Sequence, residues 1–119
     1  MNETTHLSRQ FDEDLERLRS SVLQMGGLVE TQISMTIKAY TEKTSSTVLA
    51  VIENDREVNA LEKTIDDDCI HIIAKRQPTA SDLRLIMGVS KMVTDLERSG
   101  DEVKKMAKSI RQSIGSHVA

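Results

Sequence analysis

Three long stretches of the chain repeat apolar residues at steps of three and four, and this periodicity is the strongest constraint on the fold. Such steps place the apolar side chains on one face of an α-helix. Five glycines and one proline among 119 residues leave these stretches almost uninterrupted. Because so few chain breakers favour long helices over a many-stranded sandwich, the sequence predicts an all-α protein.

Local signals mark where the three helices begin and end. The predicted helices cover residues 8–40, 45–76 and 79–114. Ser45 is a good N-cap for the second helix. Pro78 ends it, because the residue before a proline is disfavoured in the α region. Thr79, with Asp82 three residues later, resembles an acidic capping box, and Gly115 suits the end of the third helix.

Each predicted helix carries an apolar stripe that needs a partner. The stripes consist of Leu7, Phe11, Leu15, Leu18, Val22, Met25, Val29, Ile33, Ile37 and Tyr40; of Val48, Val51, Ile52, Val58, Leu61, Ile65, Cys69 and Ile72; and of Ile86, Val89, Val93, Leu96, Gly100, Val103, Ala107, Ile110 and Ile114. Ile70 and Ile73 lie off the second stripe and suggest another covered face. Gly26 and Gly27 indicate either a tolerated kink or the close approach of another helix.

Short connections make neighbouring helices antiparallel. A helix of about 30 residues is about 45 Å long at 1.5 Å per residue. We therefore expect an elongated up-down-up three-helix bundle that forms one domain over residues 4–116.

Composition excludes several kinds of function. With 16 basic and 19 acidic residues the net charge is −3, whereas a nucleic-acid-binding domain usually shows a basic excess. Cys69 is the single cysteine and cannot form an internal disulfide, so a reducing cytoplasm is the expected compartment. It lies on the apolar stripe and is expected in the core. Neither a signal peptide nor a membrane-spanning run is recognised.

Two pairs of carboxylates carry the clearest chemical signal. Glu62 with Asp66, and Glu97 with Asp101, are each spaced i and i+4, which places both members on one helix face. Like charges at this spacing cost about 0.2–0.5 kcal/mol. Neither Glu62 nor Glu97 has a Lys or Arg three or four residues away. Both pairs border the apolar stripes of helices predicted to be adjacent, so we expect one shared acidic patch.

Three interpretations of this patch remain open. Clustered carboxylates without thiolate or imidazole favour Mg²⁺, Mn²⁺, Ca²⁺ or iron, and Asp55 with Asn59 continues the same edge upstream. In the second interpretation, the chain is a plain helical homodimerisation module and the patch is only its solvated acidic edge. The third interpretation is a di-iron carboxylate enzyme, for which the nearest Glu-x-x-His match is Asp68-x-x-His71.

Three separated motifs resemble those of the PhoU family, the phosphate-specific transport system accessory proteins of bacteria. The motifs read MGG at 25–27, IIAKRQPTASDLR at 72–84 and DLERSGD at 95–101. They occur in order, and the resemblance covers about residues 11–110. It implies a three-helix repeat with two Glu/Asp-x-x-x-Asp motifs that bind metal clusters. Those motifs correspond here to Glu62, Asp66, Glu97 and Asp101, with iron, zinc, magnesium or manganese as the implied ions.

The resemblance also implies a non-enzymatic, cytoplasmic role. PhoU-like proteins restrain the phosphate-starvation response and limit phosphate uptake. They act at the inner face of the membrane between a phosphate ABC transporter and a sensor histidine kinase, which are the implied partners.

Two departures from the family pattern matter. The family usually carries two tandem three-helix repeats, whereas this chain resembles only the N-terminal one. We therefore expect self-association into a homodimer, with a second copy supplying the missing unit. Ser99 stands where the family usually has an aliphatic residue, a mild change beside Gly100.

Overall fold

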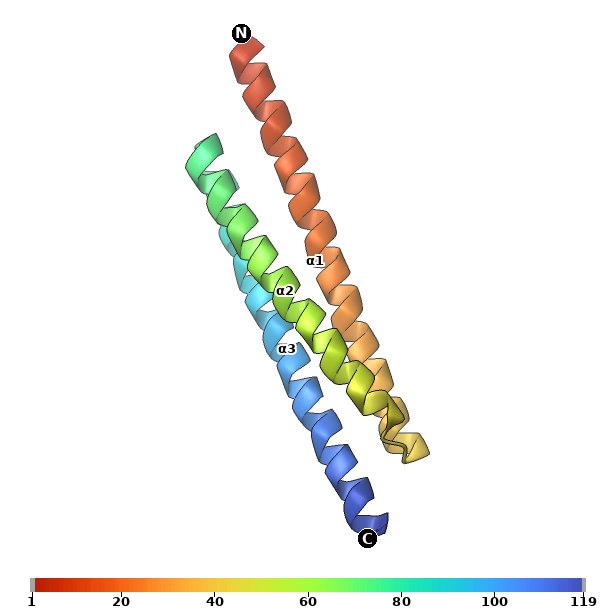
Figure 1. The fold of residues 1–119 in the computed structure, drawn as a ribbon. Helices are drawn as coiled ribbons and strands as arrows, with labels where there is room; N and C mark the ends of the chain where they lie inside the picture. Colours follow the sequence, from red (N-terminus) through yellow and green to blue (C-terminus); the bar gives the residue numbers. More distant parts are fainter. Residues whose placement is uncertain (1, 119) are drawn as a thin grey trace.

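The computed structural model consists of three long helices that pack side by side (Figure 1). They are α1 (Asn2–Glu42), α2 (Ser46–Arg76) and α3 (Ala80–Val118). The structure describes the backbone of residues 2–118 and the side chains of residues 9–115. Each helix packs against both others, and the body measures 72 × 17 × 17 Å. The expected elongated up-down-up bundle is confirmed.

The turn between α1 and α2 is closed by backbone geometry. Lys43 adopts a left-handed conformation with φ of 52°, and the Thr44 N–H then donates to the Ala39 carbonyl at 3.3 Å. This is the bond of a Schellman motif, which satisfies a carbonyl at the helix end. Ser45 holds the N-cap position as predicted but makes no side-chain capping bond. The Thr44 hydroxyl instead accepts the Ser46 N–H at 3.3 Å.

The turn between α2 and α3 lies at the predicted proline. Gln77 leaves the right-handed helical region, as expected before Pro78, but it is left-handed with φ of 47° rather than extended. The Thr79 hydroxyl accepts the Asp82 N–H at 3.2 Å, which confirms the predicted cap. The predicted stop at Gly115 is wrong, because α3 continues through it in right-handed geometry.

Two apolar clusters form the core, and a polar layer separates them. The larger cluster comprises Leu18, Met25, Val29, Val58, Ile65, Cys69, Ile72, Ile86 and Val93. The smaller cluster comprises Ala39, Val48, Val51 and Ala107. Gln32, Thr36 and Asp55 are buried between them. The α2 and α3 stripes are thereby confirmed in their main positions.

The predicted α1 stripe is wrong beyond Val29. Ile33, Ile37 and Tyr40 are 42%, 59% and 70% exposed, and the residues that point inward are Gln32, Thr36 and Ala39. Each predicted position lies one residue after a buried one, and one residue corresponds to a rotation of about 100° around the helix. A prediction based only on apolar residues therefore chose the neighbouring, exposed face. Of the rest of the stripe, the Leu7 side chain lies outside the described ones.

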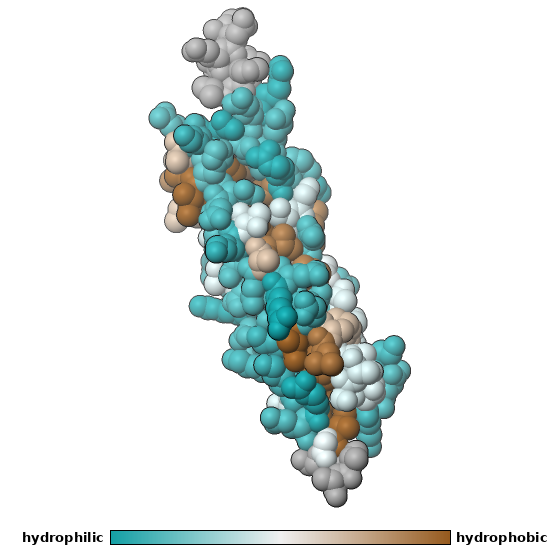
Figure 2. All heavy atoms as spheres, in the orientation of Figure 1, coloured by the Kyte–Doolittle hydropathy of each residue, from teal (hydrophilic) through white to brown (hydrophobic). Residues whose placement is uncertain are grey.

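The exposed apolar residues of α1 contribute to a groove beside α3. Tyr40 and Ile110 line it over its length, with Ile37 and Met106 at one end and Ile114 at the other. Figure 2 shows a mainly hydrophilic surface with apolar patches, including some over the lower half of the bundle. Ile70 and Ile73 are also exposed, so the described residues do not cover the second face predicted for α2.

Gly26 and Gly27 lie within the continuous α1 helix. No side chain or other helix comes within 4 Å of the place where a Cβ would stand at either residue. Close approach of another helix to either glycine is therefore excluded within the described part of the chain. Among residues 2–118, no helix is long and apolar enough to cross a membrane.

Candidate functional site

The four predicted acidic residues lie along the contact between α2 and α3. Glu62 and Glu97 are half-buried, whereas Asp66 is exposed. Burial raises the pKa of Glu62, and the negative charges of Glu97 and Asp66 raise it further. One of these charges, Asp66, lies on α2 with Glu62, and the other, Glu97, lies on α3. Because both act on Glu62, the three carboxylates share one patch rather than lying on opposite faces.

No lysine or arginine among the described side chains pairs with this part of the patch. Among the described side chains, the ion pairs involve other carboxylates, and no Lys or Arg nitrogen lies within 4.0 Å of Glu62, Asp66 or Glu97. We call Glu62, Asp66 and Glu97 the open end of the patch.

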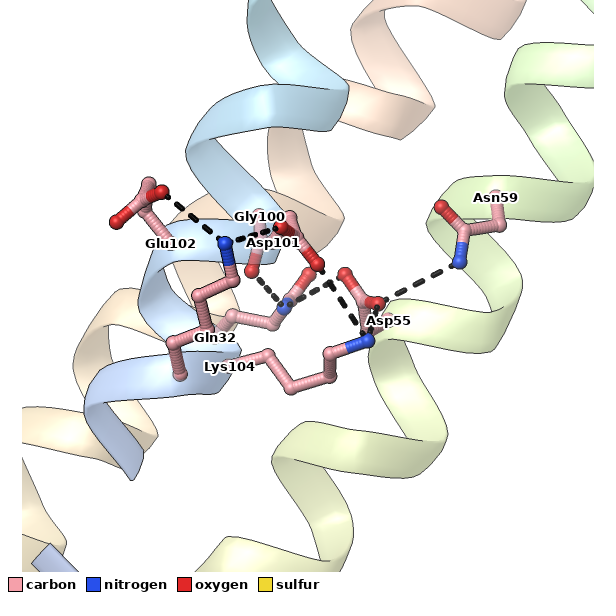
Figure 3. A network of polar contacts seen from close by, with 8 residues as sticks. Gln32, Asp55, Asn59, Gly100, Asp101, Glu102 and Lys104 are labelled. Carbon is pink, nitrogen blue, oxygen red and sulfur yellow. Dashed lines mark hydrogen bonds and ion pairs between the residues drawn. The ribbon is translucent and has the colours of Figure 1, made fainter. Parts of the chain in front are cut away.

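Asp101 is held differently. Lys105 Nζ lies 3.2 Å from Asp101 Oδ2, and Lys104 Nζ lies 3.5 Å from Asp101 Oδ1. The hydrogen bond from Lys105 lowers the pKa of Asp101. Burial acts in the opposite direction, but the charges of both lysines and a hydrogen bond from Lys104 add to the lowering, so the pKa stays below its ordinary value. Figure 3 shows Asp101 and Lys104 within a network that reaches across to α2. The negative charge of Asp101 is thus already balanced by two lysines of the same chain.

Asp55 is the centre of that network. Its side chain is only 3% exposed, and its Oδ2 lies 3.1 Å from Lys104 Nζ. Gln32 Nε2 donates to Asp55 Oδ1 at 3.4 Å and to the Gly100 carbonyl at 3.2 Å. Asn59 Nδ2 donates to Asp55 Oδ2 at 3.4 Å. We call Asp55, Asp101 and Lys104 the closed end of the patch.

Gly100 makes room for this network. A Cβ at Gly100 would lie 3.3 Å from Asp55 Oδ1 and 3.4 Å from Gln32 Oε1. Any larger residue would therefore have to displace two buried polar groups. The atoms that approach this glycine belong to side chains rather than to a neighbouring backbone.

A second buried ion pair lies near the other end of the bundle, and sequence reasoning missed it. Asp14 is 3% exposed, and Arg76 Nε donates to its Oδ2 at 2.7 Å. Arg76 also donates to Gln10 Oε1 at 3.1 Å. Burial alone would raise the pKa of Asp14, but the hydrogen bonds and charges of Arg76 and Arg17 lower it below its usual range. This pair joins α1 to the end of α2.

The chemistry of the available donors limits which ions fit. Among the described residues, no three His, Cys, Asp or Glu side chains converge closely enough to hold one ion. Cys69 is buried in the core as predicted, and burial, with the charges of Asp66 and Asp68, raises its pKa and keeps it a thiol. His71 is exposed. A preformed zinc or di-iron site is therefore not present in the part of the chain that the structure describes.

A hydrated hard cation is compatible with the open end. Mg²⁺ keeps several of its water ligands and is commonly bound through one or two carboxylates. Glu62 and Glu97 offer two such oxygen donors from facing helices. The donor set accordingly fits Mg²⁺ or Mn²⁺ better than zinc, which prefers nitrogen and sulfur ligands.

The fold and the patch together define a helical-bundle protein with a carboxylate-rich face along α2 and α3. Comparison with known proteins gives the family. Residues 22–110 match the model of the PhoU domain. The chain is 50% identical over 105 residues to the phosphate-specific transport system accessory protein PhoU homolog of Pseudomonas putida. The chain belongs to the PhoU family.

Further relatives agree with this assignment. The chain is 48% identical over 109 residues to the phosphate-specific transport system accessory protein PhoU of Escherichia coli strain K12. The crystal structure of PhoU from Pseudomonas aeruginosa superposes with a TM-score of 0.86 at 45% identity, over 89% of this chain and 51% of that one. The matches cover 88% and 92% of this chain but only 41% and 45% of the P. putida and E. coli proteins. The chain thus spans less than half the length of these relatives.

Proposed function

We propose that this chain is a non-catalytic, cytoplasmic regulator of phosphate uptake that restrains the phosphate-starvation response. The observation that carries the proposal is the close match, in sequence and in fold, to accessory proteins of phosphate-specific transport. The proposed partners are a phosphate ABC transporter and a sensor histidine kinase, which the chain bridges through its helix faces. Its contact with the membrane is through these proteins.

A complementation experiment tests this role. The full chain is expressed in a bacterium that lacks its own PhoU, and the output of a phosphate-starvation promoter is measured in excess phosphate. We expect the chain to lower that output and to co-purify with the transporter. Unchanged output from a soluble, folded chain would contradict the proposal.

We propose Glu62, Asp66 and Glu97 as the metal ligands of this chain. Asp101, the fourth ligand predicted from the sequence, is already paired with Lys104 and Lys105. The mutual repulsion of Glu62 and Glu97 supports this assignment, because an unrelieved pair of carboxylates gains most from a cation. We propose Mg²⁺ or Mn²⁺ as the ion. It would screen the like charges and leave water ligands free for partner groups.

A double substitution tests the metal assignment. Glu97→Gln with Asp101→Asn is expected to abolish Mn²⁺ binding in calorimetry at near-neutral pH while the helical circular dichroism is unchanged. The matched control is Asp12→Asn with Glu13→Gln, an exposed acidic pair on α1. Loss of helicity in the first variant, or equal loss of binding in both, would show that the patch is structural or merely solvated.

We further propose that the chain self-associates through the groove between α1 and α3. The groove exposes Tyr40, Ile37 and Met106, and relatives of about twice the length contain more chain than this bundle accounts for. A second copy is the proposed occupant. Light scattering should give a dimer mass for the wild type and a monomer mass for Tyr40→Asp, with Tyr40→Phe as control. A monomeric wild type at high concentration would refute self-association.

The homodimerisation module without a metal role is the second candidate function. The same exposed groove favours it. Dimerisation without Mn²⁺ uptake would select this candidate over the metal-binding one.

A further inference from the structure

Lys104 stands between carboxylates of two helices. Its Nζ lies 3.1 Å from Asp55 Oδ2 on α2 and 3.5 Å from Asp101 Oδ1 on α3. The Lys104 side chain is 24% exposed, whereas the Lys105 side chain, which pairs only with α3 carboxylates, is 63% exposed. Lys104 is therefore the inner of the two lysines, and its ammonium is the one that joins the helices.

The Lys104 ammonium lies between two carboxylate oxygens, and further oxygens belong to the surrounding network. Asp55 and Asp101 contribute carboxylates, and the Gly100 carbonyl belongs to the same network (Figure 3). Gln32 is fully buried, and its Oε1 accepts no hydrogen bond in the structure. That oxygen and Asp55 Oδ1 both lie within 3.4 Å of the point where a Gly100 Cβ would stand. An unpaired buried acceptor is costly, so this environment favours a positive or hydrogen-bond-donating occupant.

The open end of the patch offers the contrast. Glu62, Asp66 and Glu97 belong to the same face, yet no ammonium of the described residues reaches them. The two ends therefore differ in whether the chain supplies its own cation.

We propose that the closed end is a cation site that the Lys104 ammonium occupies, and that this lysine keeps metal ions out of the position between Asp55 and Asp101. The inference deepens the metal-binding proposal, on which it rests, by limiting a metal ion in the wild type to the open end. Metal and lysine are alternative occupants of the position between Asp55 and Asp101.

Calorimetric titration of the full chain with Mn²⁺ tests this inference. Lys104→Gln removes the charge but keeps a hydrogen-bond donor for Asp55. We expect it to bind Mn²⁺ about 10-fold more tightly or to take up an additional equivalent, because a unit charge within about 4–6 Å changes the proton affinity of a carboxylate by 1–3 pKa units. Lys104→Arg should resemble the wild type. Lys105→Gln, the matched control, should gain less than about threefold.

A further substitution locates the gained site. Adding Asp55→Asn to Lys104→Gln should remove the gain, because the new ion loses an α2 ligand. Equal gains in Lys104→Gln and Lys105→Gln would overturn the inference, since they would reflect only net charge. So would the absence of any gain in a folded Lys104→Gln variant.

Single substitutions in the lysine-containing chain provide an independent readout. Asp101→Asn should leave the Mn²⁺ affinity within about twofold, because its charge is already neutralised, whereas Glu97→Gln should lower it at least 10-fold. Equal losses would overturn the inference even if Lys104→Gln failed to fold. A wild type that binds no Mn²⁺ would refute the metal-binding proposal alone, and an Asp55-dependent gain in Lys104→Gln would still support the lysine-occupied site.

Discussion

The open and closed ends of the acidic patch use the same residue types in opposite electrostatic settings. At the open end, Glu62 is half-buried beside Glu97, and its pKa is raised. At the closed end, Asp101 is paired with Lys104 and Lys105, and its pKa is lowered. Lysines three and four residues after Asp101 account for the difference, because those positions share its helix face. Two carboxylate motifs with the same i, i+4 spacing thus differ in their electrostatic setting according to residues outside the motif.

The largest expected effect is on the closed end and comes from filling its space. Gly100→Gln should lower the free energy of unfolding by about 2–3 kcal/mol, because the new side chain must displace Asp55 and Gln32 from a packed position. Chemical denaturation measures the change.

Gly88 provides the matched control on the same helix. Nothing lies within 4 Å of its Cβ position, so Gly88→Gln should raise the free energy of unfolding by about 0.5–1 kcal/mol through helix propensity. If both variants gained stability, the packing assigned to Gly100 would be incorrect.

Removing the central carboxylate should have the next largest effect. Asp55→Ala is expected to lower the free energy of unfolding by about 1–2 kcal/mol, because Gln32 loses one acceptor and Lys104 loses its buried counter-ion. Lys104 retains partial access to water, which limits the loss. The exposed Asp66→Ala at the open end should change stability by less than about 0.5 kcal/mol. Similar losses in the two variants would erase the distinction between the ends.

At the open end, mild acidification should increase stability, whereas at groups with lowered pKa values acid decreases it. The folded-state pKa of Glu62 is raised, so its protonated form is favoured by folding, and the associated stability is lost as pH rises through that pKa. Between neutral pH and the ordinary carboxylate pKa of about 4, acidification should therefore relieve repulsion at Glu62. Glu62→Gln should raise the free energy of unfolding at pH 7 by about 0.3–0.5 kcal/mol and remove this part of the pH dependence.

Below that window, groups with lowered pKa values dominate. Asp14 and Asp101 contribute stability above the ordinary aspartate pKa, and this stability is lost as pH falls through their lowered folded-state values. In denaturation experiments at successive pH values from 7 to 3, the midpoint should first rise and then fall. A midpoint that fell steadily from neutral pH would contradict the assignment at Glu62.

The smallest expected effect is at the outer lysine. Lys105→Gln removes exposed ion pairs with Asp101 and Glu102, and such pairs contribute little because water screens them. Its denaturation midpoint should equal that of the wild type within experimental error. A clear loss would show that Lys105, rather than Lys104, neutralises the closed end.

Much of the architecture followed from local sequence signals. The helix breaks near Lys43 and Pro78 and the stripes of α2 and α3 were predicted because caps, proline and periodicity act over a few residues. The inward face of the second half of α1 was not predicted, because the polar residues Gln32 and Thr36 occupy core positions there. A pattern of apolar residues does not include them. The pair of Asp14 with Arg76 was missed for a related reason: residues 62 positions apart meet only once the helices are aligned.

The candidate site was likewise predicted only in part, where the signals were local in the sequence. The i, i+4 spacing correctly placed Glu62 and Asp66 together, and the adjacency of the helices brought Glu97 close. The sequence also placed Asp55 and Asn59 on the same edge, but the burial of Asp55 against Lys104 and Gln32 was not predicted. The heptad position of Gly100 and the polar residues at core spacing were the available signals.

The polar layer between the two apolar clusters has a consequence for the axial register of the bundle. Long helices with repeating apolar seams can slide past one another by one turn, about 5.4 Å, and still bury similar surfaces. Such a slip would separate Asp55 from Gln32 and Lys104 and bring side chains other than Gly100 against them. A few polar atoms therefore select one alignment from several that the hydrophobic contacts alone would tolerate.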